Sequence, residues 1–150
     1  QLDAIKRLWL PIVLSQFVGC LVGIVSVVFV AQLCGAPDVI VLSMASKSVT
    51  TPIAMEVTQS LGGIPSLTAA VVVVTGIIGA LVGFKMLSYG HVNSPIAQGL
   101  SMGAASHAVG ASTAMAYSSK YGAFASLGIT LNGIFTALLT PTILRLMGVV

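Results

Sequence analysis

The sequence has very little charge. Only 6% of its 150 residues are charged, with six Lys or Arg and three Asp or Glu, whereas a soluble domain averages about 25%. So few charges cannot cover a surface that faces water. Hydrophobic residues make up 57% of the chain, and the mean hydropathy is +1.09. The composition therefore predicts an all-α integral membrane protein.

Other scarcities exclude whole classes of function. The acidic residues are Asp3, Asp38 and Glu56, so catalysis by paired carboxylates would need the last two of them. The sequence contains no G-x-S-x-G, H-E-x-x-H or P-loop motif. Cys20 and Cys34 lie in one apolar run and are interpreted as packing residues, and the few basic residues form no stripe. We expect no enzyme, no metal, no cofactor and no nucleic-acid partner.

Long apolar runs predict three membrane-spanning helices, since about 20 apolar residues cross a bilayer. The predicted spans cover residues 12–33, 64–87 and 124–147. Lys6, Arg7 and Trp9 precede the first run and predict an interfacial anchor on the cytoplasmic side of the cell membrane. The run is too long for a cleavable signal peptide. Because the chain begins with Gln1, we expect further membrane segments before it in the whole protein.

Two polar interruptions separate the predicted spans. The segment 39–62 is broken by a polar stretch that starts at Ser46, and the segment 95–119 is broken by one that starts at Ser106. Thr51 followed by Pro52 is typical of a helix start, which predicts two half-helices around the first break. Non-helical backbone at membrane depth must be buried in protein or line a wet cavity.

The two broken segments indicate an internal repeat. When the chain is shifted by 60 residues, eight identities fall between positions 45 and 67, and Lys47 aligns with His107. Interrupted helices at matching positions of a repeat point to the binding site of a transporter. The positive-inside rule favours re-entrant hairpins, and therefore an inverted repeat, by a single residue. Discontinuous helices that cross the membrane remain the alternative.

The chemistry of both breaks suits a small anion. A half-helix N-terminus offers free N–H groups and the positive end of a dipole, and Lys47 adds a positive charge. Glu56 is a candidate counter-ion or coupling-ion residue. The candidate substrate-binding residues are Lys47, Ser48, Thr50, Thr51, Ser106, His107, Gly110, Ser112 and Thr113.

Several motifs resemble one known family when they are taken in order. They are Lys47-Ser48-Val49-Thr50-Thr51-Pro52-Ile53-Ala54-Met55, Gly62-Gly63-Ile64-Pro65-Ser66-Leu67-Thr68-Ala69, Ala97-Gln98-Gly99-Leu100, Ala105-Ser106-His107-Ala108-Val109-Gly110 and Gly122-Ala123-Phe124-Ala125-Ser126-Leu127. The chain resembles the LrgB/CidB family of bacterial membrane proteins from about Asp38 onward.

The resemblance implies two functions. One is transport of small monocarboxylates, because the plastid relative is a glycolate/glycerate translocator and bacterial relatives are linked to pyruvate movement. The other is an antiholin- or holin-like regulator of murein hydrolase activity and cell lysis. The resemblance further implies a homo-oligomer or a partner membrane subunit of the LrgA/CidA type, together with membrane lipid and a carboxylate anion as partners.

Overall fold

The computed structural model describes residues 2–150, apart from the side chains of Leu2 and Ala4. This part of the chain is all helical, with six helices and no strand. The helices are α1 (Leu2–Leu33), α2 (Asp38–Ala45), α3 (Thr51–Ser60), α4 (Pro65–Tyr89), α5 (Pro95–Tyr117) and α6 (Ser119–Leu146).

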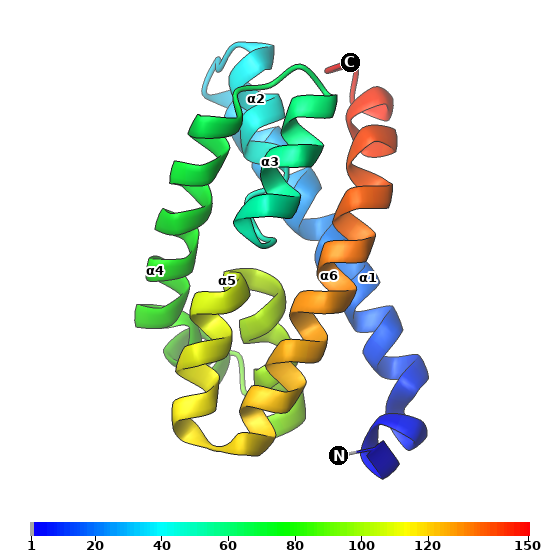
Figure 1. The fold of residues 1–150 in the computed structure, drawn as a ribbon, viewed down its shortest axis with the longest axis vertical. Coiled ribbons are helices and arrows are strands. Elements are labelled where there is room, and N and C mark those ends of the chain that lie inside the picture. The colour runs from blue at the N-terminus through cyan, green and yellow to red at the C-terminus, as the bar shows by residue number, and fades with distance from the viewer. Residues whose placement is uncertain (1) are drawn as a thin grey trace.

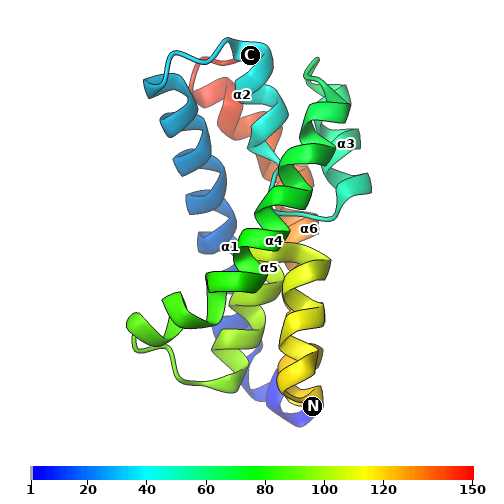
Figure 2. The ribbon, with the colours of Figure 1, turned by 90° about the vertical axis from the view of Figure 1, so that its left-hand side faces the viewer.

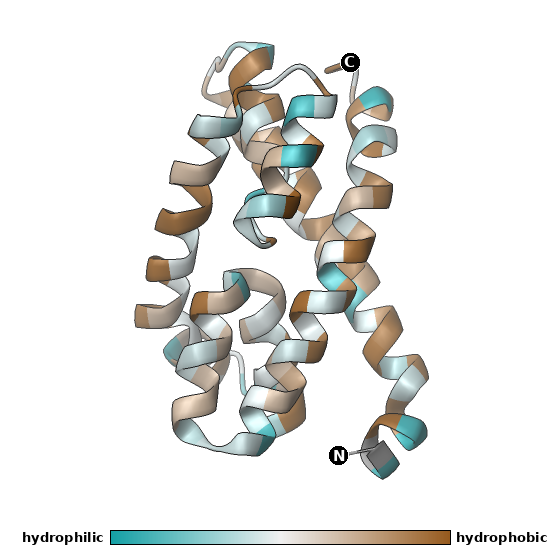
Figure 3. Cartoon of the chain, in the orientation of Figure 1, coloured by the Kyte–Doolittle hydropathy of each residue, from teal (hydrophilic) through white to brown (hydrophobic). Residues whose placement is uncertain are grey.

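Three of these helices are long and apolar enough to cross a membrane. They are α1 from Ile5 to Leu33, α4 over its full length and α6 over its full length. Hydrophobic residues predominate along α1 and α4 (Figure 3). The first helix begins ten residues before the expected span of 12–33 and continues through Pro11. The three candidates agree in number with the spans that the apolar runs predict.

The shorter helices turn back near the middle of the molecule. From the end where the C-terminus lies, α2 runs inward, the chain turns at residues 46–50, and α3 runs outward again (Figure 1). The α5 backbone leaves helical geometry at Ser106 (φ −127°) and His107 (φ 43°). Its first half runs from the opposite end toward α2 and α3, and its second half runs back to that end (Figures 1 and 2). We call these two places the first turn, residues 46–50, and the second turn, Ser106 and His107.

Buried hydroxyl groups hold α2, α3 and the start of α4 together. Ser43, Ser46, Thr58 and Thr68 are at most 1% exposed. The Thr68 hydroxyl donates to the Ser43 carbonyl oxygen at 2.8 Å and lies 2.9 Å from the Thr58 hydroxyl. The Ser46 hydroxyl donates to the Ala54 carbonyl oxygen at 3.1 Å. These bonds fix the base of the first turn, and we refer to the four residues as the hydroxyl cluster.

Glycine lets α5 approach the backbone of α6 closely. A Cβ atom on Gly99 would lie 2.6 Å from the Tyr121 carbonyl oxygen, and one on Gly128 would lie 2.5 Å from the Leu100 carbonyl oxygen. Small residues at helix interfaces are common in membranes, where helices associate mainly through close packing. The first half of α5 is therefore held against α6, and together they form one side of a cavity.

Candidate functional site

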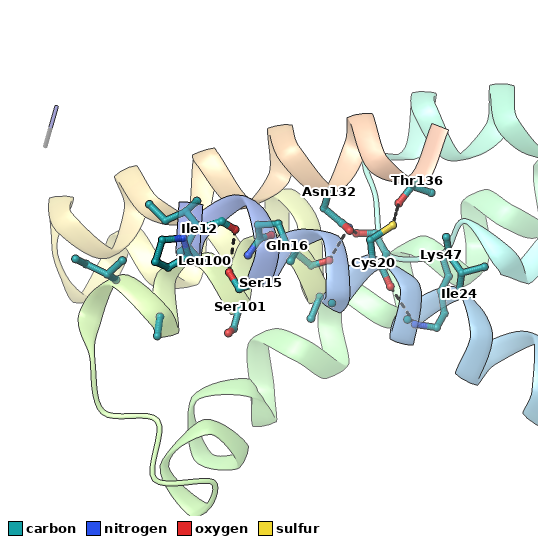
Figure 4. A pocket seen from close by; sticks show the side chains of 18 of the residues that line it. Ile12, Ser15, Gln16, Cys20, Ile24, Lys47, Leu100, Ser101, Asn132 and Thr136 are labelled. Atoms are coloured by element: carbon teal, nitrogen blue, oxygen red, sulfur yellow. Dashed lines mark hydrogen bonds between the residues drawn. The ribbon is translucent and has the colours of Figure 1, made fainter. Parts of the chain in front are cut away.

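A cavity of about 570 Å³ lies between α1, the first half of α5, α6 and the first turn (Figure 4). Its volume is within the range of small-molecule sites, which is about 300–1,000 Å³. Most of its lining is apolar. The polar side chains of its lining belong to Ser15, Gln16, Lys47, Ser48, Ser94, Ser101, Asn132 and Thr136.

Lys47 supplies the charge of this cavity. It is half-buried in the first turn, and its ammonium group donates a hydrogen bond of 3.0 Å to the Ser48 hydroxyl. Of the described residues that line the cavity, Lys47 alone is charged. Residues 2–150 hold no group of three His, Cys, Asp or Glu side chains that could bind a metal. The lining therefore suits a small anion.

Lys47 also borders a second hollow of about 390 Å³. This hollow lies between α1, α2 and α4, and its lining is almost entirely apolar, with Val27, Met44 and Val71 among its residues. The lysine thus stands between a partly polar cavity and an apolar one. Within the described residues, the one hydrogen bond of its ammonium group is made to Ser48, which lines the partly polar cavity.

Asn132 on α6 joins the two turns. It is 3% exposed, and its Nδ2 donates to the Ala104 carbonyl oxygen at 2.8 Å and to the Ser48 carbonyl oxygen at 3.1 Å. Both partners are carbonyl oxygens, which only accept, so the geometry fixes which end of the carboxamide is the NH₂ group. One side chain therefore provides donors to backbone groups beside both interruptions.

The α1 side of the cavity is lined partly by small residues. A Cβ atom on Gly19 or Gly23 would meet nothing within 4 Å. Between these glycines, the Cys20 Sγ atom lies 3.4 Å from the Thr136 hydroxyl, which connects α1 to α6 across the cavity (Figure 4). The glycines leave open space where larger side chains would fill the cavity.

The first turn places two of its expected site residues at the cavity. Lys47 and Ser48 line it, whereas Thr50 and Thr51 do not. Thr50 occupies the N-cap of α3, but its side chain makes no capping hydrogen bond. Glu56 is exposed on α3, and the ammonium group of Lys47 is bonded to Ser48.

The second turn directs its side chains toward α4 and not into the cavity. His107 is 5% exposed, and its Nε2 lies 2.9 Å from the Val72 carbonyl oxygen. Because a carbonyl oxygen only accepts, Nε2 carries the proton and donates. Ser106 is 2% exposed and packs where a Cβ atom on Gly79 would be, just as His107 packs against Gly76.

The other expected residues of α5 satisfy its own backbone. Ser112 and Thr113 both donate to the Val109 carbonyl oxygen, at 2.8 Å and 3.0 Å. Gly110 is buried, and a Cβ atom there would meet the Met102 carbonyl oxygen. These three residues do not line the cavity. The structure therefore brings Lys47 and Ser48 together at the cavity and places the second-turn residues against α4 and within α5.

Sequence reasoning missed the polar residues that the spanning helices contribute. Gln16 and Asn132 are 4% and 3% exposed, and both line the cavity. Each lies within a predicted span, at 12–33 and 124–147. A polar side chain inside an apolar span usually faces the protein interior. That signal was available for both residues, but it does not indicate which other helix each of them faces.

Comparison with known proteins identifies relatives over nearly the whole chain. The family model of the LrgB-like family matches residues 1–146. An uncharacterized protein of Haemophilus influenzae is 36% identical over 146 residues, which are 97% of this chain and 63% of the relative. The "Antiholin-like protein LrgB" of Bacillus mycoides is 32% identical over 148 residues, which are 99% of this chain and 64% of the relative.

The protein of the same name from Bacillus cereus is 31% identical, again over 99% of this chain and 64% of the relative. The chain thus spans a little under two thirds of the length of these curated relatives. No solved structure matches it. Its match to the family model over residues 1–146, its three long apolar helices and its relatives lead to one conclusion: the chain is a multi-pass membrane protein and belongs to the LrgB-like family.

Proposed function

We propose that this protein carries small monocarboxylates, of the size of glycolate, glycerate or pyruvate, across the cytoplasmic membrane. The observation that carries the proposal is the cavity beside the first turn, where Lys47 is the only charged residue of the lining within the described chain. A half-buried ammonium group that has no carboxylate partner among the described residues favours an anion beside it. Lys47 and Ser48 would bind the carboxylate, and no catalytic step is required.

The contacts of the two turns support an inverted repeat. In the second turn, His107 donates to Val72 of α4. In the first turn, Ser48, next to Lys47, accepts from Asn132 of α6. His107 follows Lys47 by 60 residues and Asn132 follows Val72 by 60 residues.

Each turn therefore packs on the spanning helix that follows the other turn, which is the exchange of contacts that a two-fold relation produces. In a membrane, two such turns would reach the middle as re-entrant hairpins from opposite faces. Transport by alternating access would then move one half of the repeat against the other around the cavity. The other expected residues would stabilise the conformation of the turns and of the helices beside them. They are Thr50, Thr51, Ser106, His107, Gly110, Ser112 and Thr113.

A second candidate is an antiholin-like regulator of cell lysis. The names of the two Bacillus relatives favour it, and they support such a role better than they support any particular cargo. In this case the protein would act through assembly, as a homo-oligomer or with a partner membrane subunit of the LrgA/CidA type. The cavity and Lys47 would then matter little for function.

A flux assay in liposomes separates the two candidates. For the carrier, we expect saturable uptake of radiolabelled glycolate or pyruvate into proteoliposomes, with a large trapped dye retained. A regulator that acts by permeabilising the membrane releases the dye and shows no saturation. Release of the dye at the same protein density that moves the carboxylate would rule out the carrier mechanism.

Filling the cavity should block uptake without unfolding the protein. Gly19 lines the cavity, and a Cβ atom there meets nothing within 4 Å, so Gly19→Phe places a ring into open space. We expect uptake to fall at least about tenfold, because binding a substrate beside the added ring overfills the site, and overpacking costs about 1–3 kcal/mol. The matched control is Val18→Phe on the 55%-exposed outer face of the same helix. Equal uptake by both variants would show that the substrate does not use this cavity.

A further inference from the structure

The cavity beside Lys47 is much larger than an acid of two or three carbons. Its volume is about 570 Å³. A water molecule takes about 30 Å³ of the liquid, so the cavity has room for about 19 of them. Glycolate has only five non-hydrogen atoms, and pyruvate has six. An anion of this size therefore leaves most of the cavity to other groups.

The cavity is also elongated. Its lining on α1 runs from Leu8 to Ile24. With a rise of about 1.5 Å per residue, this part of the helix is about 24 Å long. Lys47 lies beside Ile24 toward one end, whereas Ile12 and Leu100 lie toward the other (Figure 4). The charge is thus confined to one end of a long cleft.

Apolar side chains predominate in the part of the cleft away from Lys47. Ile12 and Leu100 line it from α1 and α5, and both are at most 5% exposed. The other apolar residues of this part are Leu8, Pro11, Ile96 and Ala97. Three serines lie among them, namely Ser15, Ser94 and Ser101. Three hydroxyl groups solvate only a small part of this surface, so replacing water there by an alkyl chain is favourable.

Lys47 can hold the acid end of a molecule whose tail lies in the apolar part. An ammonium group has three hydrogens to donate, and the Ser48 hydroxyl is the one partner that it has among the described residues. The described lining contains no second charge. A molecule with one carboxylate and one apolar end therefore matches both parts of the cleft.

The cleft is open along α1. Pro11, Ser15 and Gly19 recur every four residues, line the cleft and are exposed, so they form its rim on this helix. Alkyl chains from the surrounding membrane can therefore also reach the lining. The carboxylate distinguishes a bound acid from such a chain, because only a negatively charged end gains from the ammonium group of Lys47.

We infer that the cavity binds monocarboxylates with an alkyl tail, and that it binds them more tightly than glycolate or pyruvate. The carboxylate pairs with Lys47, and the tail lies along Ile12 and Leu100. This inference rests on the proposed function, since it uses the same ammonium group for the same chemical group of the substrate. It adds that the apolar part of the cleft selects for the length of the tail.

Unlabelled 2-hydroxy acids of increasing length test this inference as competitors of radiolabelled glycolate uptake into proteoliposomes. Glycolate, 2-hydroxybutyrate and 2-hydroxyhexanoate share one head group and differ in the tail. Each carbon that the cleft buries should strengthen competition about fourfold. We therefore expect 2-hydroxyhexanoate to compete at least about tenfold more strongly than unlabelled glycolate. Liposomes without protein give the background uptake.

Two further compounds separate the tail from the charge. The compound 2-hydroxyadipate has six carbons but ends in a second carboxylate, whose burial on an apolar lining is unfavourable, so it should compete no more strongly than glycolate. The alcohol 1-hexanol has an alkyl tail without a carboxylate and should compete weakly. Competition by either compound as strong as that by 2-hydroxyhexanoate would overturn the inference.

Ser101→Phe should remove the advantage of the longer acids. Ser101 is half-buried in the α5 lining, between the charged end and the apolar part, and a ring there takes the space of the tail. We expect 2-hydroxyhexanoate to compete no better than glycolate in this variant. Ser88→Phe is the matched control, because Ser88 is exposed on α4 and does not line the cavity; it should show the wild-type dependence on length.

The possible failures are distinguishable. If the wild type takes up glycolate but all three 2-hydroxy acids compete equally, the inference is wrong while the carrier proposal stands. The same holds if Ser101→Phe takes up glycolate and keeps the wild-type dependence on length. If Ser101→Phe takes up no glycolate, the comparison of acids in the wild type decides. If the wild type itself takes up no glycolate, the proposed function and this inference fail together.

Discussion

Lys47→Ala should lower saturable carboxylate uptake in proteoliposomes at least about tenfold, because a hydrogen bond to a charged group contributes about 1.5–3 kcal/mol. The ammonium group is the only charge among the described residues that line the cavity, and only the Ser48 hydroxyl is bonded to it. Lys47→Arg keeps the charge and should retain part of the uptake. The measurement is the initial rate of radiolabelled glycolate uptake over a range of concentrations.

Lys85 provides the control for this variant. It is exposed near the end of α4 and does not line the cavity, so Lys85→Ala should transport like the wild type. A long lysine side chain at such a position reaches the membrane interface with its charged end. If Lys47→Ala takes up carboxylate like the wild type, the anion does not bind at the first turn. A loss of uptake in both variants would indicate a general effect of surface charge.

Asn132→Leu should destabilise the protein and abolish transport together. The substitution removes the donors for the Ser48 and Ala104 carbonyl oxygens. Each buried acceptor that loses its donor costs about 1–3 kcal/mol. We expect a lower midpoint of thermal unfolding in detergent, measured by size-exclusion chromatography after heating, and uptake close to background. Asn132→Asp should be at least as damaging, because a carboxylate cannot donate to a carbonyl oxygen.

The matched control for Asn132 is Asn93→Leu, in the exposed loop before α5. Asn93 does not line the cavity, so the loss of its carboxamide should leave both the unfolding midpoint and the uptake unchanged. Should Asn132→Leu retain the wild-type midpoint, the bonds from α6 to the two turns contribute little to stability. The role assigned to this residue would then be wrong.

The helices were predictable from sequence because lipid imposes a simple rule. In lipid, the backbone N–H and C=O groups must form their hydrogen bonds within the chain. A long apolar run that crosses the membrane is therefore expected to be a helix. The runs at 12–33, 64–87 and 124–147 correspond to the three candidate spans of the structure. Their ends differ, because a bilayer sets a minimum length and not a maximum. The α1 helix extends back to Leu2 since the polar residues before the apolar run also suit a helix.

The site was predictable only in part, because polarity shows where a break lies and not which way its side chains point. The lysine at position 47 was identifiable as an unusual charge in an apolar chain. The contact of His107 with Val72, 35 residues away, depends on how α5 packs against α4. Similarly, the cavity includes Gln16 and Asn132 because α1 and α6 face each other there. Such long-range placement is not encoded in a local pattern.

The hydroxyl cluster has a mechanical consequence. The hydroxyl groups of Ser46, Thr58 and Thr68 are bonded to one another, and Thr68 also donates to the carbonyl oxygen of Ser43. All four residues are at most 1% exposed, so little water reaches these bonds. The helices α2 and α3 and the start of α4 therefore behave as one stiff block. The joint between this block and α6 includes the single carboxamide of Asn132. When the helices move relative to one another, the displacement should occur at this contact with α6, next to the cavity. The block itself should keep its internal arrangement.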